Sequence, residues 1–223
     1  INSILKVNPR ARAEAAALDL ERKTKGPRGP LHGVPVLLKD NIDTADMPTT
    51  NGSAVLRDAI PPDDAVITKA LRKAGAVILG KAAMGEFAGG SYNSVRGQTI
   101  NPYNVKRNTG GSSSGSGAAI SANFAVLAIG TDTSTSVRGP SSYTGIVGLR
   151  PTTGLVSRTG IAPKNLNFDS AGPMARNVTD LAHMLNVIAT KDPADQMNVT
   201  AWQGYRSEEH TSELQSHSFI SYA

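Results

Sequence analysis

The chain has 223 residues, of which 39% are hydrophobic and 18% charged, and its formal net charge is +5. This composition is typical of a soluble globular protein. The absence of cysteine excludes disulfide bonds and thiolate metal sites. No apolar run approaches the roughly 18 residues of a membrane span. The basic residues are scattered, and their closest cluster, between residues 22 and 28, contains no aromatic side chain. We therefore expect neither a membrane span nor a nucleic-acid partner.

The chain opens with a helical pattern. Asn8 suits the N-cap of a helix, and Pro9 suits its first position. The alanine- and leucine-rich run 11–22 predicts the helix itself, and Gly26 ends it. Residue 1 is Ile rather than Met. We therefore expect a native start, with any targeting segment, to lie upstream; the cellular location is open, and the cytoplasm is favoured.

A strand and a helix–strand unit follow. The apolar run 33–38 predicts a short buried strand that ends at Lys39. A helix is predicted over residues 63–74, because one face of it is apolar, and a strand over residues 76–79. A helix that leads into a strand at this spacing is typical of α/β proteins.

The middle of the chain contains a run of small residues. Residues 108–117 consist of Asn, Thr, Gly and Ser, a composition that also suits a flexible linker. An apolar helix (118–124) and strand (125–129) follow at once, and then a second Ser/Thr turn (131–136). Small residues on both sides of a buried helix–strand unit indicate close approach of the backbone rather than a linker. Further on, Asn177 is expected to cap an amphipathic helix.

The end of the chain differs from the rest. Residues 206–223 have no apolar periodicity and resemble a translated sequencing adapter. We treat them as a non-native tail that is disordered, and residues 1–205 as one partial domain. The predicted fold is α/β, a mixed sheet flanked by helices, truncated at both ends. We expect such a piece to be inactive and poorly folded by itself, because a partial sheet leaves an unpaired edge and an uncovered apolar face.

Histidine, the usual general base, offers no clear candidate. His32 is predicted in a turn and His183 beside the apolar stripe of a helix, and the other two lie in the tail. No cluster has metal-ligand spacing, and no phosphate-binding loop is present. What remains is Lys39, placed at the end of a buried strand, and the two Ser-rich turns. Burial lowers the pKa of a lysine and yields a neutral amine that can deprotonate a serine. The alternative for Lys39 is an ordinary surface ion pair with Asp40.

Five segments, in this order and spacing, resemble the amidase-signature family. Pro30 to Asp43 is similar to the lysine segment of that family, and Gly110 to Ala119 to its serine- and glycine-rich segment. Gly130 to Arg138 resembles the turn that carries the nucleophile. Residues 148–157 and 171–176 are similar to the segments that follow. The resemblance extends over residues 1 to about 205, and it implies an amidase-signature fold and a Ser-Ser-Lys triad.

Carried over to this sequence, the resemblance makes Lys39 the base and Ser136 the nucleophile that forms an acyl-enzyme. Ser112 becomes the bridging serine, which in the family follows a cis peptide bond, here Gly111–Ser112. Ser113 and Arg138 are supporting residues. No cofactor and no metal are implied.

The backbone N–H groups of Thr133, Ser134, Thr135 and Ser136 are the expected oxyanion donors, which stabilise the charge that develops on the carbonyl oxygen. The family usually has glycines where Ser134 and Thr135 stand. If Thr135 required a positive φ, it would be strained. Ser114 also stands where the family usually has glycine.

The leading function is therefore hydrolysis of a small-molecule carboxylic amide. An alternative within the family is the amidotransferase subunit that releases ammonia for the charging of transfer RNA. The Ser134-Thr135 departure argues against this branch. A further alternative is an inactive fragment or pseudoenzyme, although all three triad residues are present. The acyl group, the amine and the oligomeric state stay open.

Overall fold

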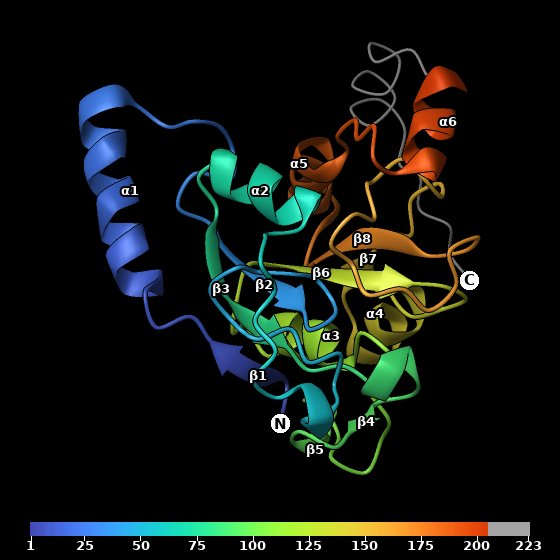
Figure 1. Ribbon diagram of the computed structural model, residues 1–223. Helices are drawn as coiled ribbons and strands as arrows, with labels where there is room; N and C mark the ends of the chain where they lie inside the picture. The colour runs from blue at the N-terminus through green and yellow to red at the C-terminus, as the bar shows by residue number, and fades with distance from the viewer. Residues whose placement is uncertain (205–223) are drawn as a thin grey trace.

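The computed structural model describes residues 1–204 and shows a six-stranded mixed sheet with helices on both faces (Figure 1). The strands are β1 (Ile4–Val7), β2 (Pro35–Lys39), β3 (Val77–Ala82), β6 (Leu127–Asp132), β7 (Val147–Gly148) and β8 (Ser170–Ala175). Their order in the sheet is β1-β3-β2-β6-β8-β7. β2 runs parallel to both of its neighbours, β3 and β6, whereas β1, β7 and β8 pair in antiparallel fashion. The predicted α/β fold with a mixed sheet is confirmed.

The helices form two layers. The structure has helices α1 (Ala11–Lys25), α2 (Val66–Lys73), α3 (Ser114–Ser121), α4 (Arg138–Thr144), α5 (Val178–Ile188) and α6 (Gln196–Gly204). Two 3-10 turns, η1 (Ala54–Leu56) and η2 (Glu86–Ala88), and a small hairpin of β4 (Tyr92–Asn93) and β5 (Gly97–Gln98) complete the described part. In Figure 1, α2 and α5 lie on one side of the sheet and α3 and α4 on the other.

Strand β2 shows how the sequence fills these two layers. Side chains along a strand point alternately to opposite faces. Val36 and Leu38 accordingly belong to the core under α2 and α5, whereas Leu37 packs with α3 residues on the other face. All three are fully buried. By the same alternation Lys39 lies on the α3 face, at the C-terminal end of a strand that is covered on both sides.

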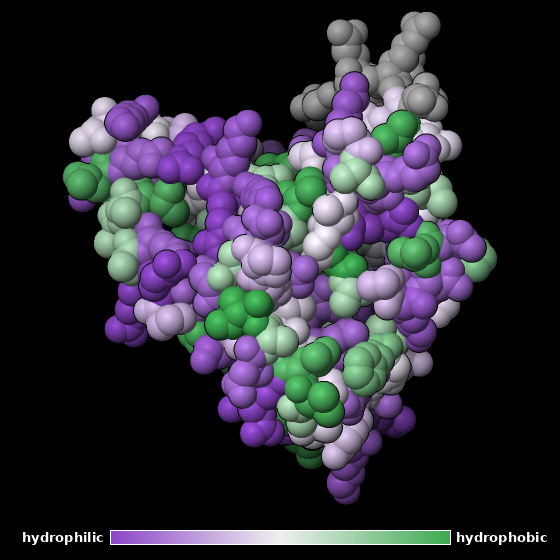
Figure 2. Space-filling view, in the orientation of Figure 1, coloured by the Kyte–Doolittle hydropathy of each residue, from purple (hydrophilic) through white to green (hydrophobic). Residues whose placement is uncertain are grey.

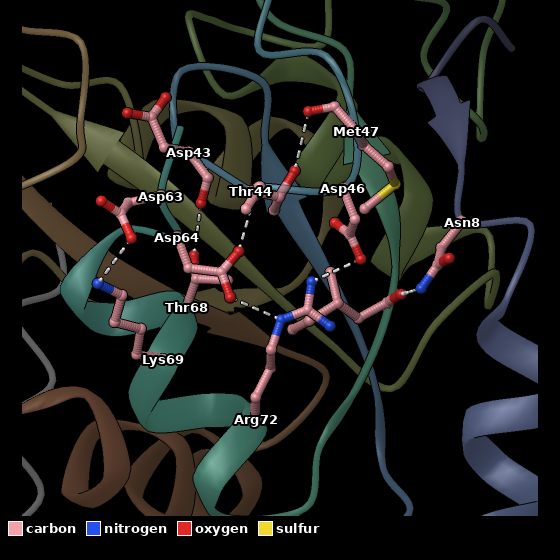
Figure 3. Close-up of polar contacts among 12 residues, drawn as sticks. Asn8, Asp43, Thr44, Asp46, Met47, Asp63, Asp64, Thr68, Lys69 and Arg72 are labelled. Carbon is pink, nitrogen blue, oxygen red and sulfur yellow. Dashed lines mark hydrogen bonds and ion pairs between the residues drawn. The ribbon is translucent and has the colours of Figure 1, made fainter. Parts of the chain in front are cut away.

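A polar network ties α1 and α2 to the loop that follows β2 (Figure 3). The Arg72 guanidinium on α2 donates to Asp64 at 2.9 Å and to Asp46 at 2.8 Å. Arg10, just before α1, donates to the same Asp46 carboxylate at 2.6 Å. Thr68 on α2 donates to the carbonyl oxygen of Asp43 at 2.9 Å. These contacts fix the position of the loop that leaves the end of β2.

Several predicted boundaries shift. The first helix begins at Ala11 rather than at Asn8-Pro9, because the Asn8 side chain accepts from the Arg10 N–H at 2.9 Å and closes a turn before the helix. The second helix begins at Val66, since Asp64 accepts from the Ala45 N–H at 2.8 Å rather than capping the helix. The third begins at Ser114 instead of residue 118.

The strands also extend beyond the predicted ends, because neighbouring strands continue to pair with them. β3 reaches Ala82 rather than residue 79, and β6 reaches Asp132 rather than residue 129. The Asn177 cap is confirmed, since its side-chain oxygen accepts from the Asp180 N–H at 2.8 Å. The predicted tail, 206–223, lies outside the described residues.

The visible surface is mostly hydrophilic, with hydrophobic residues in separate clusters (Figure 2). Among the helices of residues 1–204, none combines the length and apolarity that crossing a membrane requires.

Candidate active site

Lys39 lies in the interior at the end of β2, and its side chain is 0% exposed. Its amine is 2.7 Å from the Ser112 hydroxyl oxygen and 2.7 Å from the Thr131 hydroxyl oxygen. It also donates to the Thr131 carbonyl oxygen at 3.1 Å. All three partners are neutral. The alternative of a surface ion pair between Lys39 and Asp40 is therefore wrong.

The pKa of Lys39 follows from this environment. Burial removes water from the ammonium group and lowers the pKa from 10.5 to about 7. Asp132 opposes this shift, Lys164 adds to it, and Asp169 opposes it. A pKa near neutrality makes the neutral amine accessible, and a neutral amine can accept a proton.

Ser112 stands immediately before α3, in the serine-rich segment. The Gly111–Ser112 peptide bond is cis, as the resemblance implied. The carbonyl oxygen of Ser112 accepts from the Gly85 N–H at 3.0 Å, which fixes the backbone. Gly111 has no room for a side chain, because a Cβ atom there would lie 1.9 Å from the Gly90 carbonyl oxygen. The glycine therefore allows the backbone to pack closely at the point where Ser112 faces Lys39.

Ser136 lies in the turn between β6 and α4 and is 6% exposed. Its carbonyl oxygen accepts from the Ser113 N–H at 3.2 Å, so the turn contacts the residue next to Ser112. Within residues 1–204, no hydrogen bond joins the Ser136 hydroxyl to Ser112 or Lys39. Lys39 thus contacts the Ser112 side chain directly. Ser136 is connected to this pair by a backbone hydrogen bond to Ser113.

The backbone N–H groups of the turn 133–136 are available to bind a ligand. Within the described part of the chain, no acceptor takes a hydrogen bond from the N–H groups of these four residues. Neither Ser134 nor Thr135 has a positive φ. The strain considered for Thr135 is therefore absent, and the turn does not require glycine at these positions.

Asp132 anchors the downstream end of this turn. Its buried carboxylate accepts from the Val137 N–H at 3.0 Å and from the Arg138 N–H at 3.3 Å. The Arg138 side chain contacts Asp132 at 3.2 Å and also donates to the Ser134 carbonyl oxygen. Burial raises the pKa of Asp132, but the hydrogen bonds from Arg138 and Val137 outweigh this effect and lower it. Asp132 therefore remains ionised at neutral pH, and Arg138, predicted as a supporting residue, contacts both Asp132 and the turn.

Ser113 supports the site from the other side. Its hydroxyl oxygen accepts from the Thr131 N–H and donates to the Thr131 carbonyl oxygen, both at 3.2 Å. Ser114 is buried and donates to the Thr99 hydroxyl at 3.1 Å, away from Lys39. Of the three consecutive serines, Ser112 is therefore the one in contact with the Lys39 amine.

Sequence reasoning missed several polar partners. Thr131, which supplies two of the three contacts of Lys39, lies inside the segment that resembles the nucleophile turn but is not among the predicted site residues. Lys81 lies beyond the predicted end of its strand, at residue 79, but it is fully buried in β3 and pairs with Asp40 at 3.4 Å. Burial lowers the pKa of Lys81 and raises that of Asp40, and each charge opposes the shift of the other. Only the parallel pairing of β2 and β3 brings these two residues together.

A small cavity of about 20 Å³ lies beside the site. Its walls include Asn41, Thr131, Thr133, Lys164 and Asp169. The Asn41 side-chain nitrogen donates to the Thr131 hydroxyl oxygen at 3.1 Å, so the cavity borders the residue that holds Lys39. No group of three or more His, Asp or Glu side chains within residues 1–204 could hold a metal ion.

Comparison with known proteins identifies the family of this chain. The amidase family model matches residues 1–218. The chain belongs to the amidase family. Among curated relatives, it is 49% identical to a glutamyl-tRNA(Gln) amidotransferase subunit of Symbiobacterium thermophilum over 187 residues, which is 82% of this chain and 38% of the relative. The corresponding protein of Methanosarcina barkeri is 43% identical over 92% of this chain and 43% of the relative.

Solved structures show the same fold. The native peptide amidase of Stenotrophomonas maltophilia is 47% identical, with a TM-score of 0.87 over 89% of this chain and 42% of that protein. An amidase family protein of Bacillus anthracis is 43% identical, with a TM-score of 0.88 over 92% of this chain and 42% of that protein. The chain thus spans about two fifths of the length of these relatives.

Proposed function

We propose that this protein hydrolyses the C–N bond of a carboxylic amide through an acyl intermediate on Ser136, with Ser112 as proton relay and Lys39 as base. The observation that carries the proposal is the 2.7 Å contact between the buried Lys39 amine and the Ser112 hydroxyl. The family supplies the reaction class, and the arrangement of donors and acceptors around Lys39 supports the direction of proton transfer.

The hydrogen bonds around Lys39 favour one arrangement of protons. A neutral lysine has two N–H groups and one lone pair. The Thr131 carbonyl oxygen can only accept, so one N–H points to it. The Thr131 hydroxyl oxygen accepts from Asn41 and can also accept the second N–H. The lone pair is then left for the hydroxyl proton of Ser112, which is the arrangement that a relay through Ser112 requires.

These side chains, the amide substrate and one water molecule account for every bond and proton of the reaction. Ser136 Oγ attacks the amide carbonyl carbon; its proton moves to Ser112 as the Ser112 proton moves to Lys39. The free N–H groups of the turn 133–136 stabilise the negative oxygen. Lys39 then returns the proton through Ser112 to the nitrogen, the C–N bond breaks and the amine leaves. Water, activated by the same relay, hydrolyses the acyl–Ser136 ester and releases the carboxylic acid.

The proposal is tested by labelling the full-length protein that carries residues 1–204 with a fluorophosphonate. The parent protein should be labelled, and Ser136→Ala should abolish labelling. Ser112→Ala should retain Ser136 and slow labelling by roughly 10²- to 10⁴-fold, the range typical of general-base catalysis. Ser114→Ala is the matched control and should be labelled at the parental rate. Persistent labelling of Ser136→Ala would place the nucleophile elsewhere.

The names of the curated relatives favour a second candidate function, that of an amidotransferase subunit that releases ammonia. The same triad would then act on a side-chain amide, and the complete protein would work with partner subunits and transfer RNA. Assays of ammonia release from glutamine and of hydrolysis of a C-terminal peptide amide separate the two. Turnover of glutamine alone would favour the amidotransferase, and turnover of the peptide amide would favour the amidase.

A further inference from the structure

The turn 133–136 is held at both ends by carboxylates from different segments. Asp132 holds the downstream end, as described above. At the upstream end, the Thr133 hydroxyl donates to the Asp169 carboxylate at 2.5 Å. Strands β6 and β8 explain this contact, because Asp132 pairs with Ser170 in their antiparallel register. Thr133, which follows the end of β6, and Asp169, which precedes the start of β8, therefore face each other.

Asp169 is itself held in place. Its second carboxylate oxygen accepts from the backbone N–H groups of Lys164 at 2.7 Å and of Asn165 at 2.9 Å. Its backbone N–H donates to the Asn165 carbonyl oxygen at 2.9 Å. The carboxylate thus belongs to a closed loop, 164–169, that is held by hydrogen bonds of its own in addition to the one from Thr133.

We propose that Asp169 is a positioning residue that fixes the oxyanion turn through the Thr133 hydroxyl, so that the N–H groups of residues 133–136 point to one place. This inference rests on the proposed function. Oxyanion donors are effective only when they are preorganised, and a displacement of about 1 Å can cost roughly 100-fold in rate. The contact links β6, which carries the turn, to the loop that borders the cavity.

The same carboxylate also acts on Lys39 by its charge. The charged groups that act on Lys39 are Asp132 at the end of β6 and, in the loop before β8, Lys164 and Asp169. Lys81 and Asp40, in the neighbouring strands, pair with each other. Asp169 raises the pKa of Lys39 and Lys164 lowers it. Removing the Asp169 charge should therefore lower the pKa of Lys39, and removing the Lys164 charge should raise it.

Chemistry allows the link and the charge to be removed separately. Thr133→Val has the same shape and loses only the hydroxyl. Asp169→Asn has the same shape and loses only the charge: its amide oxygen can accept from the two backbone N–H groups, while its NH₂ donates to the Thr133 hydroxyl, which can also accept. Asp169→Ala loses both link and charge. Thr133→Ser keeps the hydroxyl and should therefore keep both the hydrogen bond to Asp169 and the parental labelling rate.

The test is the rate of fluorophosphonate labelling of the full-length protein against pH, per folded molecule. The labelling rate should reach a plateau at alkaline pH, where Lys39 is neutral, and fall along an acid limb as Lys39 becomes protonated. We expect Thr133→Val to lower the plateau roughly 10- to 100-fold without moving the acid limb. Asp169→Asn should move the acid limb to lower pH and keep the plateau within a few-fold. Asp169→Ala should show both effects, and Thr133→Ser neither. Lys164→Met, a matched control, should move the limb to higher pH with the plateau unchanged.

Two outcomes would overturn the inference. If Thr133→Val and Asp169→Ala kept the parental plateau, the link would not position the turn. If Thr133→Ser lost as much as Thr133→Val, the hydroxyl would not be the group that matters. Labelling that survives in Ser136→Ala would instead contradict the proposed function. The plateau effects would then be judged at whichever serine is labelled, so the two failures remain distinguishable.

Discussion

Two basic residues of this protein, Lys39 and Arg72, each contact several segments of the fold, but their pKa values shift in opposite directions. Lys39 at the end of β2 and Arg72 on α2 both hold several segments together. The partners of Lys39 are hydroxyl and carbonyl oxygens, and its pKa falls to about 7. Burial would also lower the pKa of Arg72, but Asp64 and Asp46 outweigh it and raise the pKa instead (Figure 3).

The difference shows what separates a reactive cation from a structural one. Desolvation lowers the pKa of both side chains, but a guanidinium starts from a much higher pKa than an amine, and only Arg72 has carboxylates in contact. Without a carboxylate in contact, Lys39 can exist as a neutral amine at neutral pH. Arg72 is charged at any pH at which the protein folds, and its two carboxylate partners within 2.9 Å connect α2 to the loop after β2.

Replacing Lys39 by arginine should have the largest effect on the labelling rate. Lys39→Arg replaces a base by a cation that does not deprotonate in proteins. We expect labelling of Ser136 by a fluorophosphonate to fall roughly 10³-fold between pH 8 and 10, where Lys39 of the parent protein is mostly neutral, because general-base catalysis contributes about 10²- to 10⁴-fold. Recovery of the rate at alkaline pH would contradict Lys39 as the base.

The pH dependence of stability provides a second test of the contrast between Lys39 and Arg72. The folded-state pKa of Lys39 is about 7 and its ordinary value is 10.5, so between these values the unfolded chain binds more protons than the folded one. The free energy of unfolding therefore falls as the pH drops from 10.5 to 7, by up to about 1.4 kcal/mol per unit. Lys39→Met removes this component, so its stability relative to the parent protein should improve as the pH is lowered through this range.

The measurement is urea unfolding of both proteins at pH 7, 8 and 9. Lys81, whose pKa is also lowered, contributes to both proteins, so the difference between them isolates Lys39. Parallel stability curves for the two proteins would show that Lys39 does not titrate in this range.

Removing Arg72 should have a smaller effect, and on stability alone. Its side chain is 27% exposed, and its partners Asp46 and Asp64 are 16% and 15% exposed. Arg72→Met leaves these carboxylates without their shared cation, and we expect a loss of about 1–3 kcal/mol, between the ranges of exposed and buried pairs. The labelling rate per folded molecule should not change.

Lys69 on the same helix supplies the matched control. It contacts Asp63 at 3.5 Å, and the two side chains are 58% and 80% exposed (Figure 3). Lys69→Ala should change the free energy of unfolding by less than about 0.5 kcal/mol. Equal losses for Lys69→Ala and Arg72→Met in urea unfolding would show that burial does not distinguish the two pairs.

Local patterns predicted much of the fold, for reasons visible in single segments. The apolar run before Lys39 predicted β2, and the Asn177 cap with its amphipathic stripe predicted α5. Helix starts were less predictable, because Asn8 and Asp64 bond to residues outside the predicted caps. Strands β3 and β6 continue past their predicted ends because pairing with neighbours, rather than their own residues, sets where they stop.

The order of residues along the chain is enough to specify the motifs: a lysine after a buried strand, a glycine at 111 where no side chain fits, and serines at 112 and 136. Which groups meet depends on how the strands and loops pack. Lys39 contacts Thr131, 92 residues away, and Thr133 contacts Asp169, 36 residues away. The physical reason is that burial and charge at one atom depend on every segment packed around it. The lowered pKa of Lys39 arises because the fold removes water from its amine and places no carboxylate in contact with it.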